Sequence, residues 1–252
     1  MAYGSDVSII AHGPQSPGTG FTIERMANAL AAPDSGAHDD ADPGLEDAPQ
    51  GSQSGRVPAF ARPRGFVIWL LATGIVGGLG SFLLLYERVQ LWNNPDHVTS
   101  CDVNPWVSCG EVMQTWQAAT FGFPNIFLGV VGFPLLLGAA FSLLASGGRL
   151  PRWYYGGLQA GVTFAFGFII WLWYAAVYSI GVLCPYCMVV WVAVIPLFVV
   201  TTARNIIFGV IPASAGVKRV AADWWWVAIV VLYLLVFASI LLNFTEAFTY
   251  GL

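Results

Sequence analysis

Long runs of apolar residues without acidic or basic side chains fill most of the chain after residue 65. A bilayer core is about 30 Å thick and needs roughly 20 apolar residues for each helix that crosses it. The stretch 153–203 has no Asp, Glu, Lys or Arg and is long enough for two crossings joined by a turn near 181–185. The pattern predicts an all-α integral membrane protein with five transmembrane helices. We expect these helices at about 66–86, 125–145, 153–180, 185–208 and 224–243.

The composition supports this class and separates an N-terminal tail from the rest. Charged residues make up 10% of the chain, whereas soluble domains carry about 25%. Residues 1–55 hold acidic side chains against Arg25 alone, and they are rich in Gly, Pro, Ser and Ala. Such a segment buries too little apolar surface to offset the entropy of ordering. We therefore predict a disordered acidic tail over 1–60 and a five-span membrane domain over 61–252.

The basic residues gather on one side of the predicted helices. The loop over 87–124 holds only Arg88, whereas the loops on the other side hold most of the Lys and Arg residues. By the positive-inside rule, the tail is cytoplasmic, and the 87–124 loop and the C-terminus are outside. No basic stripe is present, so no nucleic-acid partner is expected. The residues on the predicted cytoplasmic side are Arg56, Arg62, Arg64, Arg149, Arg152, Arg204, Lys218 and Arg219.

All four cysteines fall on the predicted outer side. Cys101 and Cys109 lie in the first outer loop, and Cys184 and Cys187 lie where the fourth helix begins. Disulfides persist in an extracytoplasmic compartment. The clustering therefore favours thiol chemistry at this surface.

The sequence Cys184-Pro185-Tyr186-Cys187 has the spacing of a redox dithiol at the start of a helix. Proline suits the first helical position, and the exposed N–H groups there favour the thiolate, which is the form that attacks a disulfide. Met188 in place of His excludes a c-type haem attachment site. The alternative is a buried cysteine pair without chemistry, or one inert disulfide.

The first pair, Cys101 and Cys109, closes a small loop that contains Pro105. Alone, such a pair is more often a structural staple than an electron relay, and the second dithiol on the same side shifts the balance towards a relay. A four-cysteine zinc site competes with this interpretation. The spacing between Cys101 and Cys109 exceeds the usual two to four intervening residues of zinc ligands, so we expect no metal.

The segment 121–125, Phe-Gly-Phe-Pro-Asn, ends the first outer loop and opens the second helix. Asn125 is then near the outer end of a lipid-embedded helix, where an unpaired amide is costly. Two interpretations stay open: a cap of the helix or a hydrogen bond to a ligand carbonyl. The preceding residues 111–120 predict a short helix lying along the membrane surface.

Together these residues resemble the vitamin K epoxide reductase family in its bacterial form. The resemblance rests on the C-D-V-x4-S-C motif that begins at Cys101, on Thr115, on the F-G-F-P-N segment, and on the later C-x-x-C motif. Both cysteine spacings, their order and the five-span layout agree together. The resemblance covers about 64–243.

This resemblance implies a bundle of four helices around a quinone, with one further peripheral helix. Cys184 and Cys187 then match the active-site pair, and Cys101 and Cys109 match the pair that shuttles electrons inward. The implied cofactor is a quinone of the menaquinone or ubiquinone type.

The resemblance also implies quinone contacts. Asn125 matches the asparagine that bonds the quinone oxygen, and Thr115 matches a Ser or Thr close to the active pair. Trp191 matches an aromatic residue that lines the same pocket, although a Tyr is familiar there and Trp cannot accept a hydrogen bond.

The implied activity is quinone-dependent thiol oxidation in a bacterial inner membrane. Fused bacterial homologues carry a thioredoxin-like domain after the fifth span, whereas only residues 244–252 follow here. We therefore expect a separate DsbA-like thioredoxin-fold partner, electrons delivered to the membrane quinone pool, and disulfide formation in exported proteins as the outcome.

Other functions compete with this one. Quinone-linked oxidases of the DsbB type have four spans and carry their C-x-x-C in the first outer loop, unlike this chain. A transporter or a scaffold with structural disulfides is the alternative of a different class. Transporters usually place ionisable groups inside their spans, and we expect none in these five.

Overall fold

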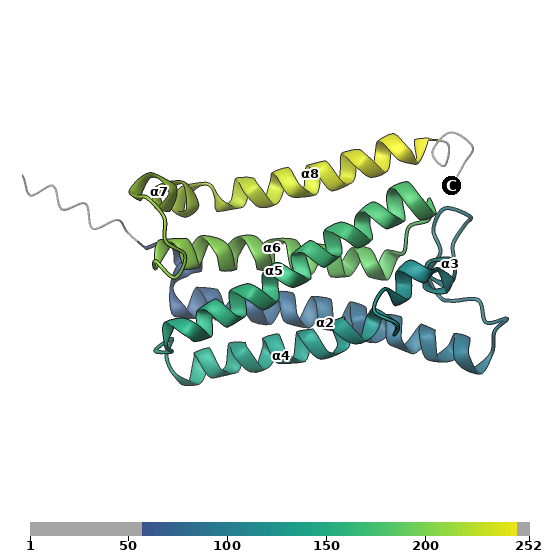
Figure 1. Ribbon diagram of the computed structural model, residues 1–252, viewed down its shortest axis with the longest axis horizontal. Helices are drawn as coiled ribbons and strands as arrows, with labels where there is room; N and C mark the ends of the chain where they lie inside the picture. The colour runs from purple at the N-terminus through teal and green to yellow at the C-terminus, as the bar shows by residue number, and fades with distance from the viewer. Residues whose placement is uncertain (1–56, 246–252) are drawn as a thin grey trace, which may run out of the picture. The chain divides into compact units, whose positions relative to one another are not determined.

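The structure is a computed structural model that describes residues 57–245, and it is built from helices (Figure 1). Five of the described helices are long and apolar enough to cross a membrane. They are α2 (Pro63–Asn93), α4 (Ile126–Ala145), α5 (Arg152–Tyr174) with its π-helical continuation η3 (Ala175–Ile180), α6 (Pro185–Ile207) and α8 (Trp225–Asn243). The predicted all-α membrane class is confirmed. The shorter elements are η1 (Ala59–Ala61), α3 (Cys109–Gln114), η2 (Trp116–Ala119) and α7 (Ala215–Asp223).

The predicted acidic tail lies almost entirely outside the described residues, and its prediction stays untested. At the predicted boundary, η1 packs into the core, with Phe60 and Ala61 buried. The ring of Phe60 contacts Trp225 at the start of α8, with 4.6 Å between the ring centroids. This turn is therefore part of the packed core, just before Pro63 opens α2.

Small residues bring α2 and α4 close together. A Cβ atom at Gly77 would overlap the ring of Phe133, and one at Gly129 would overlap the Ser81 hydroxyl. Membrane helices pack through such small residues because lipid gives no hydrophobic drive between helices. The α2–α4 pair therefore forms a tight wall on one side of the bundle.

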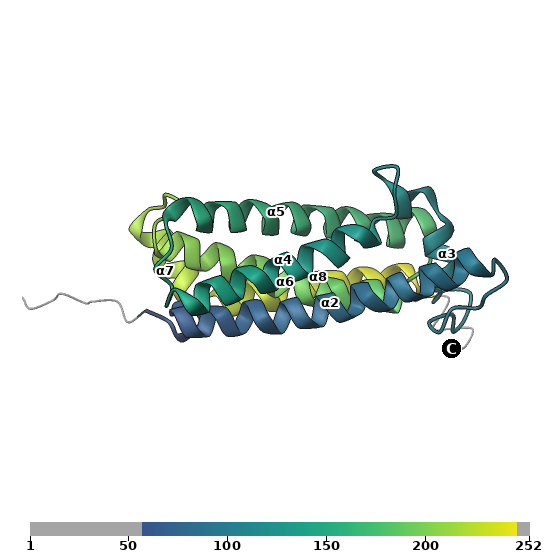
Figure 2. The same ribbon diagram turned by 90° about the horizontal axis from the view of Figure 1, so that it is seen from below.

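The helix α6 is the most buried of the five and packs against α2 and α5. Figure 2 shows α5 and α2 on opposite sides of the bundle. The helix α8 lies along the outside, held by the Tyr233 hydroxyl, which donates to the carbonyl of Val192 at 2.7 Å. A second bond runs from the Trp173 indole N–H to the Ser239 hydroxyl at 3.1 Å. The predicted arrangement of four helices with one peripheral helix is confirmed.

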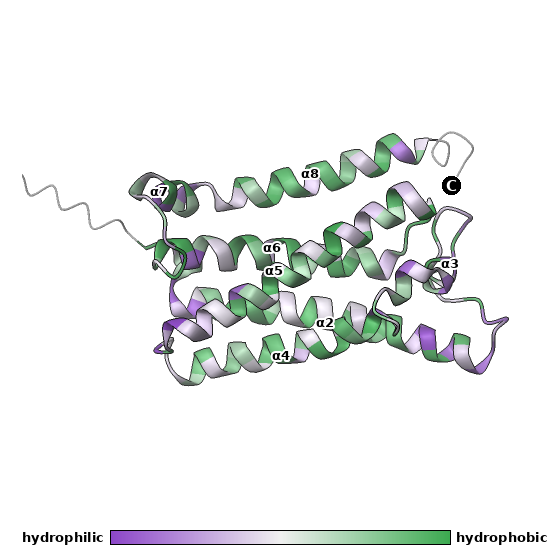
Figure 3. Cartoon of the chain, viewed as in Figure 1, coloured by the Kyte–Doolittle hydropathy of each residue, from purple (hydrophilic) through white to green (hydrophobic). Residues whose placement is uncertain are grey.

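The two ends of the bundle differ in charge and in chemistry. Hydrophilic positions concentrate towards the ends (Figure 3). One end holds α7, the turn before α5 and the start of α2, with most of the basic residues, whereas α3 and the cysteines lie at the other end (Figure 1). Only Arg88 among the described basic residues belongs to the cysteine end, where it donates to the carbonyl of Met113 at 2.6 Å. Which end faces the cytoplasm stays a prediction.

The expectation that the spans carry no ionisable group is wrong. Arg204 belongs to the last turn of α6 and is only 5% exposed. Its guanidinium carbon lies 4.5, 4.3 and 4.9 Å from the ring centroids of Phe66, Tyr155 and Phe208. Contact with ring faces and a place at a helix C-terminus both stabilise a cation. An absence of charged residues from the spans therefore does not separate this protein from a transporter.

Candidate redox site

The four cysteines come from two separate segments, 101–109 and 184–187, and meet at one end of the bundle. Cys101 and Cys109 form a disulfide with their Cα atoms 5.6 Å apart. The free thiol of Cys184 lies 3.1 Å from the Cys109 sulfur. The Cys187 backbone N–H in turn donates to the Cys184 sulfur at 3.4 Å. Cys184 is therefore within reach of a disulfide bond with Cys109, although the roles of all four cysteines stay predictions.

Two backbone hydrogen bonds clamp the two cysteine segments together. The Ser108 N–H donates to the carbonyl of Leu183 at 3.0 Å, and the Leu183 N–H donates to the carbonyl of Trp106 at 2.8 Å. Ser108 directly precedes Cys109, and Leu183 directly precedes Cys184. The clamp therefore brings the two sulfur atoms into contact.

Asp102 organises the small loop between Cys101 and Cys109. Its carboxylate accepts hydrogen bonds from the Ser108 hydroxyl at 2.6 Å, the Thr99 N–H at 2.9 Å and the Gly110 N–H at 3.1 Å. Burial alone would raise the pKa of Asp102, but the bonds from Ser108, Thr99 and Gly110 outweigh it and lower the pKa. The loop is thus held by an ionised carboxylate.

The start of α6 activates Cys184. Cys184 is the N-cap residue, and Pro185 occupies the first helical position, where its missing N–H costs nothing. The pKa of Cys184 is lowered by a hydrogen bond from the Cys187 thiol and by the backbone N–H groups of Cys187 and Tyr186, against the opposing effects of burial and of the Asp102 charge. The lowered pKa favours the thiolate of Cys184, which is the form that attacks disulfides.

Replacing Asp102 with asparagine is expected to lower the free energy of unfolding by about 2 kcal/mol near pH 7, because hydrogen bonds to a charged group are worth about 1.5–3 kcal/mol. The folded-state pKa lies below the unfolded one, so this stability is present above the ordinary Asp pKa and is lost as the pH falls through the folded pKa. The native thermal midpoint should therefore drop with acid more steeply than that of Asp102→Asn. Asp96→Asn, at an exposed carboxylate of the same loop, is the matched control, and equal pH profiles for native protein and Asp102→Asn would contradict the prediction.

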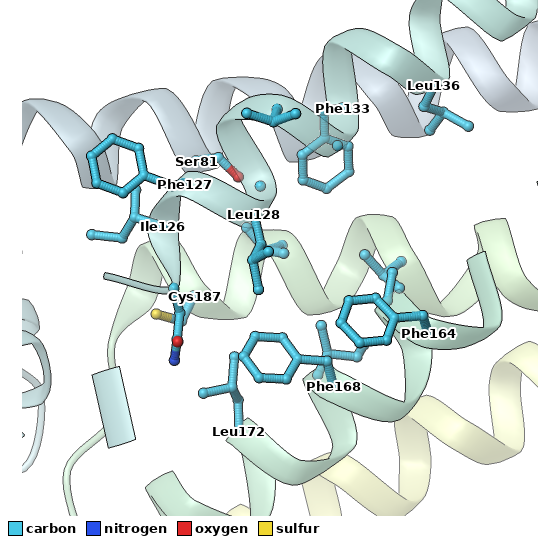
Figure 4. A pocket seen from close by; sticks show the side chains of 18 of the residues that line it. Ser81, Ile126, Phe127, Leu128, Phe133, Leu136, Phe164, Phe168, Leu172 and Cys187 are labelled. Carbon is cyan, nitrogen blue, oxygen red and sulfur yellow. The ribbon is translucent and has the colours of Figure 1, made fainter. Parts of the chain in front are cut away.

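A large apolar cavity of about 730 Å³ lies between α2, α4, α5 and α6. Figure 4 shows Phe133 and Leu136 on one wall and Phe164, Phe168 and Leu172 on the facing wall. Cys187 lines the cavity near its α3 end, together with Asn125 and Trp191, and none of the described residues of α8 lines it. A chamber of this size and polarity suits a small apolar ligand or cofactor.

The structure places Asn125 at the cavity but engages its amide elsewhere. Its Nδ2 donates to the carbonyl of Gln117 at 2.6 Å, and its Oδ1 accepts from the Thr120 N–H at 3.1 Å. The helix-cap alternative is wrong, because Asn125 has helical backbone angles and makes no cap bond to α4. Asn125 instead ties the preceding loop to the rim of the cavity.

Thr115 lies beside the reactive pair rather than in the large cavity. It lines a small neighbouring cavity of about 40 Å³, together with Cys184, Cys187 and Trp191. Its hydroxyl donates to the carbonyl of Val112 at 2.8 Å. The predicted single helix over 111–120 is broken here into α3 and η2, because Thr115 has extended backbone angles. Trp191 lines both cavities and is buried.

Sequence patterns missed the residues that support this site. Asp102 directly follows Cys101, and this position within the cysteine motif was the one sequence feature that pointed to a role in the loop. Gln117, whose amide donates to the Ser179 hydroxyl of η3 at 3.2 Å, gave no local signal because its partner is distant in sequence. Across residues 57–245, no group of three or more His, Cys, Asp or Glu is arranged to hold a metal ion.

Comparison with known proteins identifies a family but no individual curated relative. No curated protein matches the chain. A family model described as "Vitamin K epoxide reductase family" matches residues 68–202, which is more than half of the chain and includes all four cysteines. The chain belongs to the vitamin K epoxide reductase family.

Proposed function

We propose that the protein is a quinone-dependent thiol-disulfide oxidoreductase that reoxidises a DsbA-like thioredoxin-fold protein outside the cytoplasm. Family membership makes it a membrane thiol oxidoreductase; the acceptor and the partner are the proposal. One observation carries it: the Cys184–Cys187 motif contacts the Cys101–Cys109 disulfide on one side and the large apolar cavity on the other. A dithiol in that position can pass electrons from a disulfide relay to a ligand in the membrane.

The sulfur steps balance as successive thiol exchanges. A thiolate of the reduced partner attacks Cys101, and Cys109 leaves as a thiolate. Cys109 attacks Cys184 of a Cys184–Cys187 disulfide, which frees Cys187. The second partner thiolate then displaces Cys101, and Cys101 attacks Cys109 to re-form the first disulfide and release Cys184.

The reduced pair of Cys184 and Cys187 completes the cycle by giving up two electrons and two protons as its disulfide re-forms. When bound, a quinone of the menaquinone or ubiquinone type would supply the two-electron acceptor. The residues present fit such a group, because the cavity is almost wholly apolar and runs along α5 from Leu172 to Gly157, about 22 Å at 1.5 Å per residue. That length suits an isoprenoid tail, with Cys187 at the head end.

The region around Cys101 supports a protein partner. Val98 and Val103 flank Cys101 and are each 72% exposed. Both side chains are therefore accessible for contact with a partner protein. Cys101 itself is buried, so its attack by the partner requires the loop to open.

The test is turnover of native protein reconstituted in lipid vesicles with short-chain menaquinone and ubiquinone analogues and a reduced DsbA-like protein. We expect one quinone to be reduced for every two partner thiols oxidised. Absence of quinone reduction with both analogues, in protein that is folded and has intact cysteines, would contradict the proposal.

A cavity-filling variant tests the acceptor site in the same assay. Gly161 lines the cavity and has open space around its Cβ position, so Gly161→Leu fills the cavity without a backbone clash. We expect at least about a tenfold loss of kcat/KM for the quinone, roughly 1.4 kcal/mol. Gly167→Leu is the matched control, because Gly167 lies on the same helix with the same open space but outside the cavity lining. Equal losses in both variants would exclude this cavity as the acceptor site.

A further inference from the structure

A chain of hydrogen-bonded side chains, distinct from the sulfur relay, joins α2 to the C-x-x-C motif. The carboxylate of Glu87 on α2 is buried, with 4% of the residue exposed. Its Oε1 accepts from the Ser100 hydroxyl and from the Ser100 N–H at 3.2 Å. Its Oε2 lies 3.1 Å from Nε2 of His97. The Ser100 oxygen also lies 2.9 Å from the Tyr186 hydroxyl.

The direction of these bonds follows from the number of protons available. A serine hydroxyl has one proton and two acceptor lone pairs. The Ser100 proton is used by Glu87, which as a carboxylate can only accept. Tyr186 is therefore the donor to Ser100, and the chain runs from Tyr186 through Ser100 to Glu87.

Two residues of this hydrogen-bonded series are sequence neighbours of the reacting cysteines. Ser100 directly precedes Cys101, and Tyr186 lies between Cys184 and Cys187. These hydrogen bonds thus link the Cys101 end of the disulfide to the C-x-x-C motif, whose Cys184 sulfur lies 3.1 Å from that of Cys109. This series of hydrogen bonds begins on α2 and is separate from the backbone clamp at Leu183.

A carboxylate at this place is costly unless its charge is satisfied. Burial of an ionised group in an apolar setting is unfavourable without hydrogen bonds or a partner charge. Glu87 receives an N–H, a hydroxyl and an imidazole, and it belongs to the polar end of a membrane-spanning helix. A glutamine there could not accept from all three groups, because half of its amide is a donor.

We propose that Glu87 is a positioning residue for thiol exchange, which acts through Ser100 and Tyr186 to hold Cys184 in register with Cys109. This inference rests on the proposed function, since it concerns the same relay. Exchange between thiols requires the sulfur atoms within about 3–3.5 Å and aligned, and a misplacement of about 1 Å can slow such a step by about 100-fold. Loss of the carboxylate frees Ser100 to rotate, and Tyr186 then loses its fixed acceptor.

The test measures exchange between the two cysteine pairs without quinone or partner. Protein oxidised at both cysteine pairs receives one equivalent of a soluble dithiol that reduces Cys101 and Cys109, and the transfer of electrons to Cys184 and Cys187 is followed by rapid acid quenching, alkylation and mass spectrometry. We expect Glu87→Gln and Ser100→Ala to slow the transfer at least about tenfold. Glu111→Gln is the matched control, because Glu111 is an exposed carboxylate on α3 near the same end, and its transfer rate should equal the native one.

A double-mutant cycle separates positioning from a purely structural tether. Tyr186→Phe should slow the transfer in the native background and have no further effect in the Ser100→Ala background, because both changes break the same chain. Native transfer rates in both Ser100→Ala and Tyr186→Phe would overturn the proposal, whatever happens to the folding of Glu87→Gln. Because no quinone is present, failure of quinone reduction in vesicles would contradict the proposed function and leave this result standing.

Discussion

Replacing Cys187 with alanine is expected to abolish electron transfer to quinone while the protein stays folded. Cys187 is the one cysteine of the described residues that lines the large cavity. Without its thiol, the Cys184–Cys187 disulfide cannot form, so no two-electron step can deliver electrons to a ligand there. We expect turnover with either quinone analogue to fall by at least about 1,000-fold, the scale seen when a covalent catalytic group is removed.

The control for this variant is the step that precedes it. In Cys187→Ala, the Cys101–Cys109 disulfide should still form and should still react with the reduced partner, because both cysteines and the Asp102 loop are intact. Thiol counting on the partner after a single mixing event measures that step. Turnover of Cys187→Ala at the native rate would exclude Cys187 as the terminal donor and, with it, the assignment of the cavity as the acceptor site.

The helical layout was predictable because the bilayer imposes a strict condition on sequence. Backbone polar groups have no water to bind in the hydrocarbon core, so each crossing must be a helix of about 20 apolar residues. The limits of the charge-free runs therefore gave the positions of α4, α5 and α6 closely. The helix α2 ends at Asn93 rather than near 86, because the apolar run marks where the lipid core ends and the helix itself continues beyond it.

The charged residues at helix ends were the misjudged part of the fold. Arg204 ends a charge-free run and is counted from the sequence among the basic residues of the cytoplasmic side, but it lies in the last turn of α6 and is buried. Two of its stabilising rings come from other helices, Phe66 on α2 and Tyr155 on α5. Contacts of that kind depend on helix packing, which no local pattern contains.

Within the site, the motif spacing predicted the cysteines but not the groups that hold them. The C-x-x-C spacing places Cys184 and Cys187 on one helical turn, so their proximity follows from helix geometry alone. The approach of Cys109 to Cys184 depends instead on the backbone clamp at Leu183. The two cysteines are 75 residues apart in the sequence. The hydrogen bonds of Asn125 to its own preceding loop were likewise invisible, since an isolated polar residue at a span end fits several roles.

The double variant Cys101→Ala, Cys187→Ala is expected to form a Cys109–Cys184 disulfide in nearly all molecules under mild oxidation. Each remaining cysteine has lost its ordinary partner, and the two sulfur atoms already lie 3.1 Å apart. The backbone bonds between Ser108, Leu183 and Trp106 hold the two segments in that register, so little conformational entropy is lost when the bond forms. Peptide mapping under non-reducing conditions measures the yield.

The matched control moves the second thiol by one helical turn. Cys101→Ala, Cys184→Ala leaves Cys109 with Cys187, whose side chain lines the large cavity, and we expect its yield to be at least about tenfold lower, a bias of roughly 1.4 kcal/mol. High and equal yields in both variants would mean that the loop carrying Cys109 samples both sulfur positions freely. In that case the clamp at Leu183 would not direct exchange to Cys184.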